Sequence, residues 1–491
     1  MNKTEYKPTW KNWLMGAIAC GLLIAFLVWI QSWWGIIALP FVFDAYVTKY
    51  IRWDWWKDIE DPVMRGIMSW VDAIVFALVA VYFVNVYFFQ NYVIPSSSLE
   101  KSLLVGDYLV VSKMSYGPRV PQTPLHAPLC QHTLPFGWGK SYIEWPQWEY
   151  KRVSPKQISL NDIVVFNYPA GDTVAMNMQN ADYYGLCKSI YLDNVGYPTG
   201  FDSLSTLQKY RFYNYAIQTA SDAIKQNPQQ FGEVIWRPVD RRENYVKRCV
   251  GLPGQTLEIR DHIVYLDGKA NREPRDVQYN YIVKWKGRMA KDDPFIKEHD
   301  ISYEDLYGRD QYGMANNPDI AACETVLPLT ESARKALASR TDLVESITYC
   351  PQPSGEHLYP LNADYGWSTD NYGPIWIPQR GKSIELNLDN LPIYERPIRI
   401  YEGNDLRVTD DGQILINGKV ATRYTFKMDY YWMQGDNRHN SADSRFWGFV
   451  PEDHIVGKPI MIWLSTNKDK SIFDLGYIRW NRIFSLVENH N

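Results

Sequence analysis

Long apolar runs fill the first 90 residues of the chain and then stop. Residues 13–30 form an uncharged run of 18 residues, close to the length that crosses a bilayer. A shorter run over 33–47 is interrupted by Pro40 and Asp44, and a third covers 68–90. Because more apolar sequence follows the first run, it is not interpreted as a cleavable signal sequence. The pattern predicts a membrane anchor over residues 1–91 and leaves open whether the middle run spans.

Basic residues flank these runs in two clusters. Lys3, Lys7 and Lys11 precede the first run, and the second cluster lies between the second and third runs: Lys49, Arg52, Lys57 and Arg65. Positive residues tend to stay on the cytoplasmic side. Both clusters can be inside only if the first two runs form a hairpin that turns outside at residues 31–32. We therefore expect the third run to lead out of the cell, with everything after residue 92 outside.

Beyond residue 92 the pattern changes to short strands rich in β-branched residues. Such strands are predicted over 108–113, 162–166, 244–250, 255–260, 263–266, 406–408, 413–416, 430–433 and 460–464. The dipeptides Asp267-Gly268 and Asn417-Gly418 are typical of tight hairpin turns. The fold class predicted is therefore mainly β: N-terminal transmembrane helices followed by an antiparallel β domain over residues 92–270 and 396–465.

Several stretches interrupt this strand pattern. We expect insertions at 115–152, which is rich in Pro and aromatic residues, and at 172–241, where 205–226 has helical spacing. Residues 271–395 mix helical and loop patterns, and loops this long usually have a role, so they are predicted to form an inserted α+β subdomain. The tail at 466–491 contains a basic, aromatic stretch at 477–484. It is predicted to be amphipathic, lying on the outer membrane surface or packing as a helix.

Composition narrows the functional classes. A net charge of −4 gives no electrostatic basis for binding nucleic acid. The six cysteines include no CxxC pair and the eight histidines show no ligand spacing, so no metal and no other cofactor is expected. One disulfide among Cys187, Cys323 and Cys350 is plausible if the domain is exported. Aromatic residues make up 15% of the chain, which suits a membrane interface.

Three polar clusters carry the candidate chemistry. The stretch 94–107 places Ser96, Ser97 and Ser98 on a loop directly after the last apolar run. The stretch 244–254 places Lys247 in a strand with apolar neighbours, where loss of water would lower its pKa and allow it to act as a base. The stretch 435–448 alternates acids, arginines and amides, which suggests a braced loop. Alone, these clusters could be a linker, a snorkelling lysine and a surface turn.

Together and in this order, the clusters resemble bacterial signal peptidase I, a family of membrane-bound serine proteases. The motifs that carry the resemblance are Ile-Pro-Ser-x-Ser with Gly-Asp, Asp-Ile-Val-Val-Phe, Tyr-Val-Lys-Arg with Gly-Leu-Pro-Gly, and Gly-Asp-Asn-Arg-x-Asn-Ser-x-Asp-Ser-Arg. They cover about residues 92–116, 158–169, 244–269 and 405–464. The resemblance implies that the β domain is catalytic and uses a Ser–Lys dyad.

Residue by residue, the resemblance makes Ser98 the nucleophile and Lys247 its general base. Ser96 would complete the oxyanion hole with the backbone N–H of Ser98. A serine is a weak nucleophile until a base takes its proton, and oxyanion donors are usually a large catalytic contribution. Phe166, Tyr245 and Met433 would shield the lysine from water. Ser441 would orient Lys247 by a hydrogen bond, and three charged residues would hold the loops through ion pairs: Asp443, Arg445 and Arg248.

The resemblance also implies a substrate: secretory pre-proteins whose signal peptides are cut after a small-x-small motif. Strand-like pairing with the β domain would bind them. Residues expected to contact the substrate are Tyr92, Ile94, Leu99, Leu103, Leu109, Val165, Tyr245 and Val246. The resemblance implies the lipid bilayer as a second partner. It is also compatible with contact with the export machinery. The implied location is the bacterial inner (plasma) membrane, multi-pass, with the catalytic domain on the outer or periplasmic side.

The sequence departs from the family pattern at four places, and none of these departures removes an implied catalytic group. Leu99 stands where Met is usual, Lys101-Ser102 where Pro-Thr is common, Asn161 where Gly precedes the strand, and His439 where Asp is frequent. His439 raises one rival scheme, a Ser98–His439–Asp triad. Two other functions stay open: a catalytically inactive, membrane-tethered protein that binds export partners on the same fold, and a self-cleaving Ser–Lys peptidase.

Overall fold

The computed structural model describes residues 6–487 except 180, 288, 290–292, 300, 302–323, 353–356 and 469. Lys3 and Cys323, both named above, lie outside this part of the chain, as do the last four residues of the tail. The chain divides into two compact units. The first contains residues 1–90 and 116–156, and the second contains residues 91–115 and 157–491. The 115–152 stretch therefore belongs with the anchor and not with the β domain.

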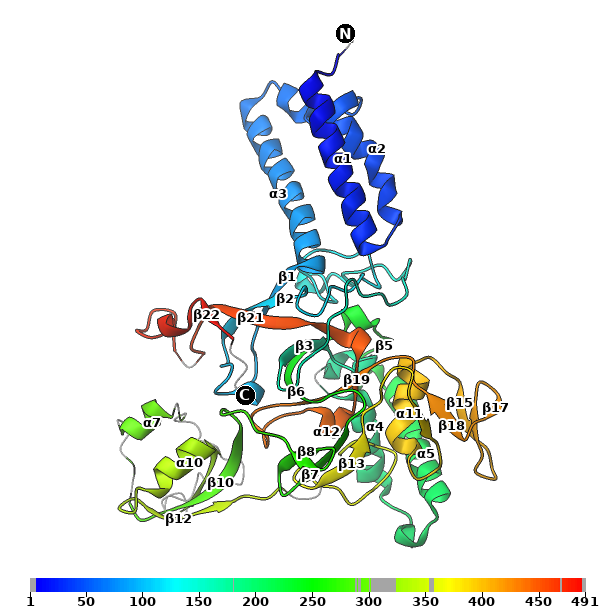
Figure 1. Cartoon of the computed structure of the whole chain (residues 1–491), viewed down its shortest axis with the longest axis vertical. Helices are drawn as coiled ribbons and strands as arrows, with labels where there is room; N and C mark the ends of the chain where they lie inside the picture. The colour runs from blue at the N-terminus through cyan, green and yellow to red at the C-terminus, as the bar shows by residue number, and fades with distance from the viewer. Residues whose placement is uncertain are drawn as a thin grey trace. The chain divides into compact units, whose positions relative to one another are not determined.

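The first unit contains the apolar helices, drawn in blue in Figure 1. Helices α1 (Trp10–Ile30) and α3 (Pro62–Tyr87) are long and apolar enough to cross a membrane. Between them the middle run forms a shorter apolar helix over Trp34–Thr48, made of η1 (Trp34–Ile37), α2 (Ala38–Phe43) and η2 (Asp44–Thr48). Thus two of the three predicted segments have spanning length.

Residues 116–156, which we call the collar, are tied to the ends of α1 and α3. The collar has little regular structure, and isolated bridges such as Arg119–Arg152 hold it together. The Tyr82 hydroxyl donates to the Pro124 carbonyl at 2.7 Å, and Val120 and Val153 pack in one apolar cluster with Leu27, Ile30 and Tyr87. Burial of these apolar side chains stabilises the unit by removing them from water.

The second unit is organised around an eight-stranded sheet whose strand order is β1-β2-β21-β3-β6-β19-β20, with β22 also pairing with β21. All pairings recorded within it are antiparallel. The strands are β1 (Phe89–Val93), β2 (Asp107–Ser112), β3 (Ile163–Asn167), β6 (Asn244–Gly251), β19 (Tyr430–Gln434), β20 (Val450–Pro451), β21 (Ile455–Ser465) and β22 (Ser485–Leu486). Strand β3 is buried along its whole length, as its uninterrupted apolar run predicted.

Smaller sheets surround this one. Strands β13-β7-β8-β9 form one, from β7 (Thr256–Arg260), β8 (Ile263–Leu266), β9 (Lys269–Ala270) and β13 (Tyr372–Trp376). Others contain β14 (Ser383–Glu385) with β18 (Arg423–Thr425), and β15 (Leu406–Val408), β16 (Ile414–Ile416) and β17 (Lys419–Val420). The hairpin turns predicted at Asp267-Gly268 and Asn417-Gly418 both have positive φ angles at their two residues, as tight hairpins require.

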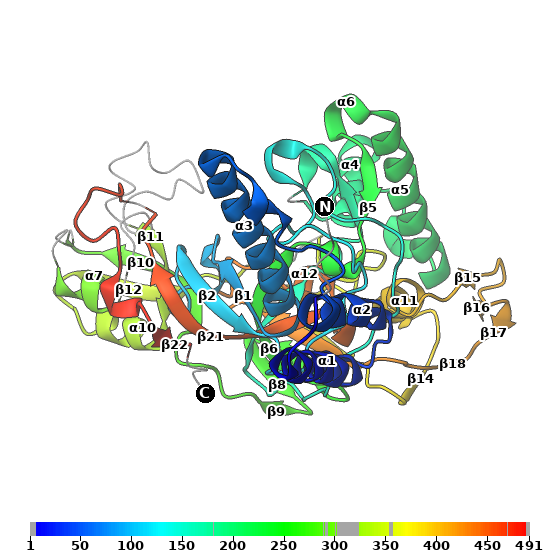
Figure 2. The same ribbon diagram turned by 90° about the horizontal axis from the view of Figure 1, so that it is seen from above.

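The inserted stretch 271–395 does not fold as one body. Its first part forms a three-stranded sheet with its own core: β10 (Gln278–Trp285), β11 (Glu324–Thr330) and β12 (Val344–Tyr349), with α7 (Pro294–Glu298) and α10 (Glu331–Ala338). Figure 2 shows α7 and α10 beside these strands. Its last part, including Tyr359, Ile377 and α11 (Leu391–Arg396), packs instead in the large core around Trp432 and Phe449.

The predicted "mainly β" composition is not confirmed, because 34% of the described residues are helical and 25% are in strands. The apolar helices of the first unit account for much of the helix. Another part comes from the 172–241 stretch, where α4 (Tyr183–Val195) and α5 (Thr206–Gln226) pack side by side (Figure 2) next to β4 (Thr173–Ala175), α6 (Pro228–Phe231) and β5 (Val234–Trp236). The predicted helical spacing at 205–226 matches α5.

The C-terminal tail packs along β21 and does not form an amphipathic helix. In its described part, residues 480–482 make a single 3₁₀ turn and β22 pairs with β21. Arg482 donates to Asp107 at 2.7 Å, and Arg479 donates to the Val105 carbonyl at 3.0 Å. The basic residues that suggested a membrane surface are thus used to hold the tail to β2 and its preceding turn. The five described cysteines are free thiols.

Candidate active site

Ser98 and Lys247 lie in hydrogen-bond contact. The Lys247 Nζ donates to the Ser98 Oγ at 2.6 Å, although the two residues are 149 positions apart. Both side chains are buried, with 6% of Ser98 and 5% of Lys247 exposed. A serine hydroxyl in contact with an amine that is shut off from water is the arrangement that a nucleophile and its base require.

The positions of both residues follow from the main sheet. Ser98 lies in the short 3₁₀ turn η4 (Ser97–Leu99), just after β1. The backbone of Ile94 is held on both sides, since its N–H donates to the Asp107 carbonyl and its carbonyl accepts from Gly106. Lys247 lies in β6 opposite Val164 of β3. Because side chains alternate along a strand, Lys247 and Arg248 point to opposite faces of the sheet.

Burial lowers the pKa of Lys247 to about 8, because a charged amine is poorly stabilised away from water. The carboxylates of Asp443 and Asp436 act in the opposite direction and keep the pKa from falling further. Strand register places Val164, Phe166 and Tyr245 on the same face as Lys247. Phe166 and Met433 are fully buried, and Lys247 Nζ lies 5.8 Å from the centre of the Tyr245 ring. Tyr245 therefore lies close to the lysine amine, while the expected shielding by Phe166 and Met433 stays a prediction.

Arg248 is paired with Asp436 on the other face of β6. Its Nε and Nη2 donate to the two carboxylate oxygens, each at 2.7 Å, and its Nη1 donates to the Asn161 carbonyl at 2.8 Å. Ser102 completes the group, since its hydroxyl donates to Asp436 at 2.7 Å and accepts from Arg248 at 3.1 Å. Burial alone would raise the pKa of Asp436, but the Arg248 charge holds that pKa below its usual value.

The loop 435–445, which we call the bracing loop, holds the backbone of Ser98. The Asn437 N–H donates to the Ser98 carbonyl at 3.1 Å, and the Asn440 amide donates to the Ser97 hydroxyl at 3.0 Å. Asp443 and Arg445 form a buried bidentate pair inside the loop, at 2.9 and 2.8 Å. Bidentate pairs of this kind fix geometry as well as charge. The backbone of Ser98 is thereby anchored to a loop more than 300 residues later in the chain.

Two expected contacts of the dyad have a different form. Ser441 was expected to bond Lys247, but its buried hydroxyl has no hydrogen-bond partner among the described residues. The expected Ser441–Lys247 hydrogen bond is therefore not formed, and the Lys247 amine donates to Ser98. Ser96 is exposed and has extended backbone geometry, two residues before Ser98.

His439 points away from Ser98 and into contacts with the inserted stretch. Its Nδ1 accepts the Asn280 N–H at 3.1 Å, and its Nε2 lies 3.2 Å from Asp370 and 3.0 Å from the Tyr349 hydroxyl. Both ring nitrogens are thus engaged. This arrangement contradicts the Ser98–His439–Asp triad, since no ring nitrogen is left to take a proton from Ser98.

The inserted stretch also joins the bracing loop through its backbone. Gln278, the first residue of β10, makes a parallel bridge with Asn437. The Gln278 N–H donates to the Asp436 carbonyl at 2.9 Å, and its carbonyl accepts from Arg438 at 3.1 Å. The loop that holds Ser98 is therefore itself held by β10.

Seven of the eight residues expected to contact substrate belong to one apolar cluster. Among them, Leu99, Leu103 and Leu109 are at most 1% exposed, so these side chains form the floor of the region and not its surface. Tyr92 and Val246 are partly exposed at its edge. Tyr245 lies outside the cluster and stacks on Tyr168 with ring centres 4.5 Å apart. The cluster includes Tyr92, Ile94, Leu99, Leu103, Leu109, Val165 and Val246.

Two of the four departures from the family pattern occur where the backbone is left-handed. Lys101 has a φ of +77° and Asn161 a φ of +69°. Proline, with φ fixed near −65°, could not occupy position 101 in this conformation. Asparagine is among the side chains that best tolerate the left-handed region, which explains how it replaces glycine. At Gly106, also left-handed, a Cβ would lie 2.1 Å from the Thr466 carbonyl.

Sequence reasoning missed the parts of the site that depend on distant pairing. Asp436 and Ser102 received no role, although both contact Arg248. The Gly-Asp-Asn motif could have indicated a role for Asp436. A carboxylate that is buried beside a tight turn needs a cationic partner. In the described part of the chain no group of three or more His, Cys, Asp or Glu residues is arranged to hold a metal ion.

Comparison with known proteins agrees with these motifs. The family model described as "Signal peptidase, peptidase S26" matches residues 67–307 and 381–464, well over half of the chain. Signal peptidase I of Haemophilus influenzae is 47% identical over 130 residues, covering 22% of this chain and 37% of that protein. Signal peptidase I from two Buchnera aphidicola subspecies is 57% identical over 56 residues (11% of this chain, 18% of the relative) and 37% identical over 128 residues (26% and 38%).

These alignments cover less than two fifths of each relative's own length. The family model leaves residues 308–380 unmatched between its two segments. The match of the family model to most of the chain, around a site assembled from the same motifs, is enough to assign the family: this chain belongs to the signal peptidase family, peptidase S26.

Proposed function

We propose that this protein is a membrane-bound serine endopeptidase that cleaves signal peptides from exported pre-proteins after small-x-small motifs. The single observation that carries the proposal is the 2.6 Å contact between the buried Lys247 amine and the Ser98 hydroxyl. Family membership supports the substrate class, and two candidate membrane helices support the location.

In the proposed mechanism, neutral Lys247 takes the proton of Ser98 as its Oγ attacks the carbonyl carbon of the scissile peptide. The lowered pKa of the lysine supports this role, because a larger fraction of the amine is neutral near pH 8 than in water. The Ser98 N–H and the Ser96 hydroxyl would donate to the developing oxyanion. The protonated lysine then gives its proton to the leaving amine, and water hydrolyses the acyl-enzyme by the same path in reverse.

The remaining assignments belong to the same proposal. Arg248, Asp443 and Arg445 would brace the two loops, and Tyr92, Tyr245 and Val246 would contact an extended substrate. The two clusters of basic residues, one before the first apolar run and one between the second and third, support a multi-pass arrangement. They favour a catalytic domain on the outer side of the membrane. Only 11 positions separate the end of α3 at Tyr87 from Ser98. A linker of this length spans at most about 40 Å, which would keep the nucleophile close to the bilayer where a signal peptide ends.

The test uses the full-length protein in detergent with a pre-protein that carries an Ala-x-Ala motif. We expect Ser98→Ala and Lys247→Ala each to abolish cleavage at the motif while leaving the unfolding transition cooperative. Ser97→Ala is the matched control and should cleave normally. His439→Asn should retain most activity, because His439 does not contact Ser98. Cleavage by Lys247→Ala would overturn the dyad, and no cut by the wild type at any pH would favour the inactive binding protein.

A further inference from the structure

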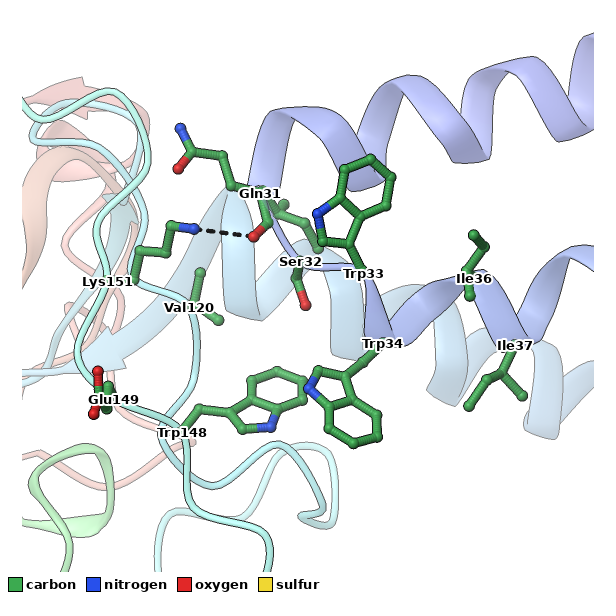
Figure 3. Close-up of a pocket in the computed structure, with 11 residues that line it drawn as sticks. Gln31, Ser32, Trp33, Trp34, Ile36, Ile37, Val120, Trp148, Glu149 and Lys151 are labelled. Carbon is green, nitrogen blue, oxygen red and sulfur yellow. Dashed lines mark hydrogen bonds between the residues drawn. The ribbon is translucent and has the colours of Figure 1, made fainter.

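A pocket of about 460 Å³ opens where α1 ends and turns into η1 (Figure 3). One wall comes from residues 30–37. The other comes from the collar, through Val120, Trp148, Glu149 and Lys151. Both walls belong to the first compact unit. The pocket is therefore a feature of the membrane anchor and is separate from the dyad.

The wall that η1 provides is apolar and open. Trp33 and Trp34 are 65% and 66% exposed, and Ile36 and Ile37 are 49% and 63% exposed. In Figure 3 the Trp34 and Trp148 rings lie next to each other at the mouth, with the two isoleucines beyond them along η1. Adjacent exposed side chains of this kind are unfavourable in water. Tryptophan and isoleucine at the end of a membrane-length helix are instead suited to contact with lipid chains.

The rim opposite this wall carries one cation and one anion. The Lys151 Nζ donates to the Gln31 carbonyl at 2.9 Å, as Figure 3 shows by its dashed line. An ammonium group has three N–H donors, so this bond fixes its position and leaves two for a ligand. The exposed carboxylate of Glu149 lines the same pocket two residues earlier. The pocket thus places a positive and a negative group beside an apolar wall.

The position of the pocket along the helices agrees with the level of the lipid headgroups in a bilayer. The basic residues Lys11 and Lys49 mark the opposite end of the α1–η2 hairpin, since α1 starts at Trp10 and η2 ends at Thr48. At the pocket end, the collar exposes six large apolar side chains that would suit the interface: Leu125, Leu129, Phe136, Trp138, Ile143 and Trp145. Aromatic side chains concentrate at the level of lipid headgroups.

We propose that this pocket binds one amine-bearing, zwitterionic phospholipid of the phosphatidylethanolamine class. Its phosphate accepts from Lys151, its ammonium group donates to Glu149, and its acyl chains lie along Trp34, Ile36 and Ile37. The paired charges are what select this class, because an anionic headgroup would satisfy Lys151 and leave Glu149 opposed by a like charge. The proposal concerns the anchor and does not depend on the peptidase function.

The test uses full-length protein in bilayer discs that contain a photoactivatable phosphatidylethanolamine, with adducts mapped by peptide mass spectrometry. Adducts on residues 30–37 and 148–151 are divided by adducts on the exposed face of α3 around Trp70 and Phe76, which report general contact with lipid. We expect this ratio to exceed one in the wild type. Lys151→Ala should lower it about tenfold, the factor that corresponds to a lost charge-assisted hydrogen bond.

Matched variants separate binding from folding and from general charge. Lys140→Ala removes a collar lysine paired with Glu144 outside the pocket and should leave the ratio unchanged. Lys151→Arg should retain it, since the cation and its bond to Gln31 can both persist. Glu149→Gln should lower adducts from phosphatidylethanolamine but not from photoactivatable phosphatidylglycerol. A wild-type ratio near one, or equal effects of Lys151→Ala and Lys140→Ala, would overturn the proposal.

Discussion

Lys247 donates to Ser98 across a 2.6 Å contact in which both side chains are almost fully buried. The burial that brings the two groups together is also what lowers the pKa of Lys247 to about 8. One physical cause therefore sets the geometry of the Ser98–Lys247 contact, the pH at which the amine becomes neutral, and the stability that a buried amine removes from the fold.

The first prediction concerns pH and activity. Because only neutral Lys247 can accept the Ser98 proton, we expect kcat/KM to rise with pH through an apparent pKa near 8. Lys247→Arg should be inactive at every pH, since a guanidinium group stays protonated. The measurement is cleavage of a pre-protein between pH 6 and pH 10. An ascending limb centred near pH 6.5, as for a histidine base, would contradict the scheme.

The same pKa shift predicts how stability depends on pH. The folded-state pKa near 8 lies below the ordinary value of 10.5, so between these values the unfolded chain binds more protons and stability rises with pH. Below about pH 8 the full cost of charging the buried amine is present. Lys247→Met should therefore unfold later than wild type in urea at pH 7, by about 1–3 kcal/mol. The stability advantage of Lys247→Met over the wild type should be smaller at pH 10. A wild type that is more stable than Lys247→Met at pH 7 would refute the prediction.

The ion pair between Arg248 and Asp436 should contribute more to the stability of the fold than to the rate of the chemical step. Asp436→Asn leaves the buried Arg248 guanidinium without its charge partner, and breaking such a pair costs about 3–5 kcal/mol. Activity should fall with stability, because Asp436 is adjacent to Asn437, whose N–H holds the Ser98 carbonyl. Asp405→Asn, which breaks an exposed pair with Arg407, is the control and should cost at most about 1 kcal/mol. Equal denaturant midpoints for the two variants would refute the assignment.

The Ser441 hydroxyl, which has no hydrogen-bond partner among the described residues, gives the fourth prediction. A buried hydroxyl without a hydrogen bond is unfavourable, so Ser441→Ala should leave stability unchanged or raise it by up to about 1 kcal/mol. Because Ser441 does not contact Lys247, the ascending limb of the pH profile should stay near 8. Valine at this position is a harsher comparison, since it adds volume beside Gly435. A shift of the limb in Ser441→Ala would show that the hydroxyl orients the lysine during turnover.

The left-handed backbone at Lys101 gives the fifth prediction. A side chain with a φ of +77° is strained, so Lys101→Gly should stabilise the protein by about 0.5–1 kcal/mol. Lys101→Ala keeps the Cβ and should change little. Lys101→Pro, which restores the residue common in the family, should be destabilising because its φ cannot become positive. Thermal unfolding of the three variants measures this directly, and a stable proline variant would show that the turn can invert.

Local patterns in the sequence predicted the site better than they predicted the architecture. Ser98, Lys247 and the bracing loop could be named because each lies in a contiguous motif, and strand alternation explains why Lys247 and Arg248 face opposite ways. The pairing of Arg248 with Asp436 could not be read from the sequence, since register between distant strands is set by the tertiary core. For the same reason the collar appeared to be an insertion in the β domain, although Val120 and Val153 pack with α1 and α3.

The bridge between Gln278 and Asn437 limits how the chain could be shortened at the inserted stretch. Gln278 occupies the Asp436 carbonyl and the Arg438 N–H with hydrogen bonds, and a chain without β10 would have to satisfy both groups in another way. Because the Asn437 N–H between them donates to the Ser98 carbonyl, we expect a deletion that begins at residue 271 to loosen the loop behind Ser98. A deletion that keeps Gln278 and its strand would leave this loop held.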